Sequence, residues 1–140
     1  EIFLKKSNKV FINDSKATSF QASRFALESN KNIFWIVGGM PKLGDKFELG
    51  KLKNNIAKSY IIGNYMKNFK NQLNGKVHFQ LSRTLNNAII SIFRDIKNIT
   101  DKKVTILLSP ASASYDQFKN FEERGNEFKR LIKNHARKYI

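Results

Sequence analysis

The sequence predicts an α/β fold with three αβα layers and a mostly parallel sheet of about six strands. Two observations carry this prediction: short apolar runs alternate with helical patterns, and each strand run is continuously apolar, as in strands that are buried on both faces. The strands are expected at residues 9–13, 33–37, 59–62, 77–81 and 104–108, with 2–5 as a weaker sixth. Because no repeat or linker divides the chain, residues 1–140 are expected to form one domain.

The helices follow from apolar residues at helical spacing. The clearest case is 85–96, where apolar residues recur at the i, i+3, i+4, i+7 spacing of a one-sided helix that Ser82 or Thr84 would cap. Further helices are expected at 19–29, 49–55, 64–72 and 117–138, the last interrupted at Gly125.

The composition excludes several classes of function. The chain has no cysteine, which excludes thiol catalysis, thiolate metal sites and disulfides. No apolar run reaches the roughly 18 residues of a membrane span, and the first residues lack a signal-peptide pattern, so we expect a cytoplasmic protein without membrane contact. His78 and His135 have no second ligand at the spacing of a metal-binding helix, so no metal site is expected.

The formal charge of +15 invites a nucleic-acid interpretation. However, the lysines are scattered and far outnumber the arginines that read phosphates and bases. Asn and Ile are abundant as well, which indicates a compositional bias. We therefore expect no specific nucleic-acid binding.

Three loops follow strands at the expected carboxyl edge of the sheet, where ligands of such folds bind. In the first, residues 13–18, Thr18 and Gln21 have the form of a capping box, so a helix start with Asp14 and Lys16 beside it is expected. From this loop alone, a strand, a turn and a cap without a ligand is the favoured interpretation.

The second loop contains Gly38, Gly39 and Lys42. Paired glycines let the backbone approach a ligand closely, and the lysine supplies a point charge for a carboxylate or phosphate. Neither a P-loop nor a dinucleotide-binding pattern occurs in the chain, so a simple turn stays open as the alternative.

The third loop, residues 108–118, is rich in serine. Ser114 and Gln117 form a second possible capping box, so Ser114 would cap a helix, bind an anion, or do both. A serine hydrolase is excluded because the G-x-S-x-G pattern does not occur. We expect Lys42 and Ser114 to lie on exposed loops, so that replacing either by alanine leaves the fold intact.

Together and in this order, the three loops resemble one known family. The segments FINDSKATS, WIVGGMPK and LLSPASASYDQFKNFEERGNEF are similar to the carboxyl-terminal domain of the Mur ligase family, and DSKAT and DQFKNFEERG are typical of its D-glutamate-adding members. The resemblance covers about residues 10–132. It implies a Rossmann-like domain that binds the incoming amino acid and works with a UDP-sugar-binding domain and an ATPase domain.

The resemblance also implies a reaction and site residues. ATP and magnesium would serve to phosphorylate the carboxylate of UDP-N-acetylmuramoyl-L-alanine, and D-glutamate would then displace the phosphate, a step of peptidoglycan precursor synthesis in bacteria. Carried over by position, the D-glutamate ligands would be Thr18, Lys42, Ser114 and the backbone at Phe121, with Tyr115 packed beside them. The side chains facing the nucleotide and the acyl phosphate would be Asp14 and Lys16, supported by Ser15, Gly38 and Gly39.

The same resemblance limits what these 140 residues are expected to do. Without a P-loop they should not activate ATP, so ATP and magnesium would be held mainly by the other domains and this domain alone would be inactive. It is expected to be a monomer. The alternative is a stand-alone module of the same fold that binds amino acids or polyanions and does not ligate.

Overall fold

Six strands form one sheet in the computed structural model, which describes residues 1–139. The strands are β1 (Ile2–Lys6), β2 (Lys9–Asn13), β3 (Ile33–Gly38), β4 (Ile56–Ile62), β5 (Phe79–Arg83) and β6 (Val104–Leu108). Their order across the sheet is β1-β2-β6-β3-β4-β5. Only β1 among them runs antiparallel to its neighbour, so the prediction of a mostly parallel sheet is confirmed.

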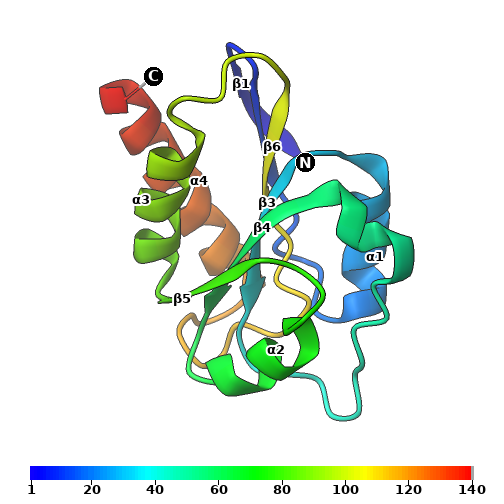
Figure 1. Cartoon of the computed structure of the whole chain (residues 1–140). Coiled ribbons are helices and arrows are strands. Elements are labelled where there is room, and N and C mark those ends of the chain that lie inside the picture. The colour runs from blue at the N-terminus through cyan, green and yellow to red at the C-terminus, as the bar shows by residue number, and fades with distance from the viewer. Residues whose placement is uncertain (140) are drawn as a thin grey trace.

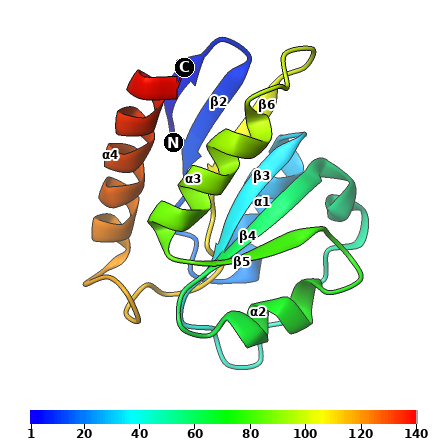
Figure 2. The same ribbon diagram turned by 60° about the vertical axis from the view of Figure 1, so that its left-hand side comes forward.

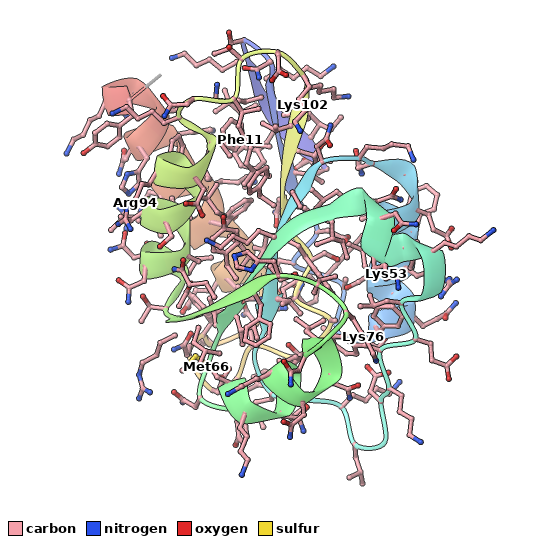
Figure 3. All side chains as sticks on the ribbon, viewed as in Figure 1. Phe11, Lys53, Met66, Lys76, Arg94 and Lys102 are labelled. Carbon is pink, nitrogen blue, oxygen red and sulfur yellow. The ribbon has the colours of Figure 1, made fainter. Side chains whose placement is uncertain are left out.

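Helices cover both faces of this sheet (Figures 1 and 2). One layer contains α1 (Phe20–Ser29), the 3-10 helix η1 (Gly50–Asn55) and α2 (Met66–Leu73); the other contains α3 (Leu85–Ile96) and α4 (Phe121–Tyr139). Because successive strand side chains point to opposite faces, Trp35 packs toward the first layer and Phe34 and Ile36 toward the second. Figure 3 shows Phe11 among the side chains between the sheet and α3. The three-layer prediction is therefore confirmed.

The boundaries differ from the expectation at several places. β4 begins at Ile56, earlier than expected, and β5 is shifted to Phe79–Arg83. α4 begins at Phe121 and runs through Gly125 without interruption. A Cβ on Gly125 would lie 2.8 Å from Asn13 Nδ2 and 3.2 Å from Ser15 Cβ, so this glycine lets the helix pack directly against the end of β2.

The sheet brings the three candidate loops to one edge. β2, β6 and β3 are neighbours, and Leu108 at the end of β6 pairs in register with Asn13 on one side and Ile36 on the other. Since these strands are parallel, the loops after them begin at the same level. The fold therefore places residues 13–19, 38–49 and 109–120 side by side.

Two surface properties complete the description. In Figure 3, Arg94 lies on the left of the molecule, Lys102 at the top, and Lys53 and Lys76 on the right, in keeping with scattered charge. Within residues 1–139, the helices fall short of the length and apolarity that crossing a membrane requires.

Candidate functional site

Backbone hydrogen bonds join the three loops. Met40 N donates to Ala113 O at 2.8 Å and Ala113 N donates to Met40 O at 3.3 Å, which forms a two-residue antiparallel bridge. Gly38 N donates to Pro110 O at 3.0 Å, and Asp14 N donates to Leu108 O at 2.7 Å. The loop after β6 is thus bonded to the loop on either side of it.

A hollow of ≈380 Å³ lies where the loops meet. Its lining residues come from all three loops: Thr18, Ser19, Met40, Pro41, Lys42, Ala113 and Tyr115. Three of them are residues that the sequence singled out, and their side chains are exposed. A volume of this order is sufficient for a small-molecule ligand.

Lys42 is the cation of this hollow. Its side chain is exposed, and it makes no ion pair with any of the described residues. Its ammonium group is therefore available to an anion. The expectation that Lys42 lies on an exposed loop is confirmed.

Ser114 lies next to the hollow but is buried, with a relative exposure of 2%, so the expectation of an exposed residue is wrong. Its hydroxyl has no hydrogen-bond partner among residues 1–139. Its carbonyl accepts from Gln117 N at 3.1 Å and Phe118 N at 2.8 Å, so Ser114 begins a turn. The helix cap is Asn120, whose Oδ1 accepts from Glu123 N at 2.8 Å, and the predicted capping box at Ser114 is wrong.

The start of α1 also differs from the prediction. Ser19 caps this helix by accepting from Ala22 N at 3.2 Å, and the capping box expected at Thr18 is wrong. Asp45 Oδ2 accepts from Phe20 N at 2.8 Å. A carboxylate of the protein itself therefore occupies the start of α1. Because these amides are taken, an anion in the hollow would have to be bound by side chains such as Lys42 and Thr18.

Asp14 and Lys16 lie on the same loop and differ in their surroundings. Asp14 Oδ2 accepts from Ser109 Oγ at 2.7 Å, while the side chain of Lys16 is exposed. Partial burial raises the pKa of the Asp14 carboxyl, although the Ser109 hydrogen bond and nearby positive charges act against this rise.

Ser15 is buried and connects this loop to the start of α4. Its hydroxyl donates to the carbonyl of Phe121 at 2.7 Å. Phe121 itself is exposed, with a relative exposure of 39%. The structure thus brings Phe121 to the loop of Asp14 and Lys16 through its backbone, the part of this residue that the resemblance implicated.

Gly38 and Gly39 were expected to let the backbone approach a ligand closely. In the structure they instead let it approach other backbone atoms of the protein. Both residues have positive φ, of 126° and 138°. A Cβ on Gly38 would lie 2.2 Å from the carbonyl oxygen of Ile62, and one on Gly39 would lie 2.3 Å from that of Ala113. The glycines therefore support the site by letting the loops pack together.

Sequence reasoning missed two residues that organise the site. Arg124 is 1% exposed and bonds to Ser15 and Ser112 on two of the loops. Asp116 Oδ2 accepts from Asn64 N at 2.9 Å, which attaches the third loop to the residues after β4. The signal for Arg124 was its helical spacing, since it lies four residues before the buried Phe128 and shares the apolar face of α4.

Other features of the described residues do not point to a site. No cluster of three or more potential metal ligands occurs within residues 1–139. A second hollow, of ≈440 Å³, lies between α3 and α4 and is lined by Phe93, His135 and Tyr139, among others. None of the residues predicted for the site lines it.

Comparison with known proteins supports the resemblance of the loops, although no family model matches the chain. The UDP-N-acetylmuramoylalanine--D-glutamate ligases of Nitrobacter hamburgensis and Brucella abortus are each 43% identical to it over 129 residues. That of Rhodopseudomonas palustris is 41% identical over 128 residues. The matches cover 91–92% of this chain but 28% of each relative, so the chain spans little more than a quarter of their length. The chain is therefore homologous to the carboxyl-terminal part of the D-glutamate-adding ligases of the Mur ligase family.

Proposed function

We propose that this chain is the D-glutamate-binding domain of an ATP-dependent ligase that adds D-glutamate to UDP-N-acetylmuramoyl-L-alanine through an acyl phosphate. The observation that carries the proposal is the hollow at the carboxyl edge, to which Thr18, Lys42 and Tyr115 converge from three separate loops. The homology to ligases named for D-glutamate supports the same assignment.

The chemistry of the hollow suits a dicarboxylate amino acid. Lys42 has no carboxylate partner among the described residues, and hydrogen bonds to charged groups contribute about 1.5–3 kcal/mol each. Ser114 contributes a hydroxyl without a partner. Because this hydroxyl is covered, D-glutamate would reach it only if the neighbouring loop atoms shift. We therefore assign one carboxylate to Lys42 and Thr18 and the second to Ser114 and the Phe121 backbone.

ATP and magnesium belong to the other parts of the proposed full ligase. The described residues offer no metal-ligand cluster, and the sequence has no phosphate-binding loop. This domain would position D-glutamate, and Asp14 and Lys16 would face the reacting groups when the domains close on each other. Alone, it would not ligate.

An NMR titration of the isotopically labelled chain tests the proposal. D-Glutamate should shift the amide signals of residues 16–18, 42 and 114–121 more than L-glutamate does. Lys42→Ala should weaken binding about 10- to 150-fold, the loss of one charge-assisted contact. Lys53→Ala is the control, because Lys53 is an exposed lysine on η1, away from the hollow.

The outcomes separate the proposal from its alternatives. Equal binding of both isomers, or binding of polyanions in general, would support a stand-alone binding module. Shifts across a broad lysine surface with a short DNA duplex, and none with glutamate, would refute the ligase assignment.

A further inference from the structure

Arg124 is a buried cation beneath the three loops of the proposed site. It lies in the first turns of α4, with a relative exposure of 1%. The described residues provide no carboxylate within ion-pair distance of it, and its Nη1 atom has no hydrogen-bond partner among them. Burial lowers the pKa of Arg124 to about 10, a change that the charge of Asp116 partly opposes.

Such a residue is a poor choice for stability alone. Removing a guanidinium from water costs free energy, and replacing buried charged groups by apolar residues of similar volume is often neutral or stabilising. Phe128 and Ile132, on the same face of α4, show that this face otherwise packs with apolar side chains. The presence of an arginine here therefore calls for a role other than core packing.

The contacts of Arg124 indicate that role. Nε donates to Ser15 Oγ at 2.9 Å, and Nη2 donates to the carbonyls of Ser15 at 2.7 Å and of Ser112 at 3.0 Å. One planar group thus holds the backbone of the first loop and that of the third. Its Nη1 lies 3.3 Å from the place of a Cβ on Gly39, so it also faces the second loop.

The residues held in this way lie one to three positions before site residues. Ser15 is followed by Lys16 and Thr18, and Ser112 comes two residues before Ser114. We propose that Arg124 is a positioning residue that sets the distance between the two halves of the proposed D-glutamate site by bonding the backbones of Ser15 and Ser112. The identity of the ligand in this inference rests on the proposed function. The role of Arg124 in holding the two loops does not.

The test compares three variants of the full chain. Arg124→Met removes all donors while keeping an apolar side chain of similar length, and Arg124→Lys keeps the charge but loses the fork of donors. Arg130→Met is the control, since Arg130 is an exposed arginine of the same helix that pairs with Glu127. Each variant is measured by thermal unfolding, by amide hydrogen exchange without ligand and by D-glutamate titration.

Arg124→Met should still unfold cooperatively, at a lower Tm because the carbonyls of Ser15 and Ser112 lose their donor. The amides of residues 15–18 and 112–115 should exchange faster relative to the rest of the chain, and D-glutamate should bind at least about tenfold more weakly. Arg124→Lys should restore part of both losses and provides the test if the methionine variant does not fold. Unchanged loop exchange in Arg124→Met would overturn the inference. A wild-type chain that does not bind D-glutamate would refute the proposed function, while the exchange data would still decide the role of Arg124.

Discussion

Replacing Gly39 by alanine should destabilise the protein much more than replacing Gly44 by alanine. Both glycines have positive φ, 138° and 77°, but their surroundings differ. A Cβ on Gly39 would lie 2.3 Å from Ala113 O and 2.8 Å from Ser112 Oγ, whereas one on Gly44 meets nothing within 4 Å. The pair therefore separates the cost of steric overlap from the cost of backbone conformation.

The magnitudes follow from these distances. Positive φ costs an alanine about 1–2 kcal/mol, offset by about 0.4–1 kcal/mol from the lower entropy of the unfolded chain, so Gly44→Ala should cost about 1 kcal/mol. Gly39→Ala adds an overlap with a backbone carbonyl that only a movement of the third loop relieves, at about 1–3 kcal/mol more. Its φ of 138° also lies outside the left-handed helical region that alanine tolerates best.

Urea unfolding measures both variants on one scale, and the midpoints can be compared directly if the m values agree. We expect Gly39→Ala to lose about 2 kcal/mol more than Gly44→Ala, and to bind D-glutamate more weakly because the Met40–Ala113 bridge must open. Equal losses in the two variants would show that the second and third loops do not pack as closely as described.

Two further predictions concern the core and the charge of the site. Phe93→Ala should lower the free energy of unfolding by about 3–5 kcal/mol, because Phe93 is 7% exposed and its ring stacks on that of Phe11 at 5.9 Å. Urea unfolding measures this loss. Phe25→Ala is the control: Phe25 is 77% exposed, so its loss should stay below about 0.5 kcal/mol. Asp14→Asn should raise Tm at pH 7, because burial raises the pKa of the native carboxyl and its ionised form therefore costs stability above that pKa. This gain should vanish as the pH falls below the carboxyl's usual value of 3.8, and a gain that is independent of pH would contradict the reasoning.

The strands and layers could be predicted because a strand that is buried on both faces appears in the sequence as a continuous apolar run. A run such as residues 33–37 is apolar at every position, and the structure buries each of them. The helix starts were harder to predict because adjacent hydroxyl residues compete for the same cap. Thr18 has Gln21 at the capping-box spacing, yet the structure uses the neighbouring Ser19, whose hydroxyl accepts from Ala22 N.

The third loop shows where local patterns fail. Ser114 and Gln117 match a capping box, yet residues 115–117 form a turn and 118–120 a bend. Asp116 accepts from Asn64 N and Gln117 Nε2 donates to Arg83 O at 3.0 Å, which holds the segment in this conformation. These partners lie 52 and 34 residues away in the chain, so no window around Ser114 contains them.

Such distant partners also set the order in which this part of the molecule can form. Residues 109–120 contain neither helix nor strand, and their hydrogen bonds reach Met40, Asn64 and Arg83 at the ends of three other strands. We therefore expect the segment to become ordered after those strands have paired, because closing such long loops is slow. Changes that displace the ends of β3, β4 or β5 should therefore perturb the binding surface through residues 109–120, even where they lie far from the hollow.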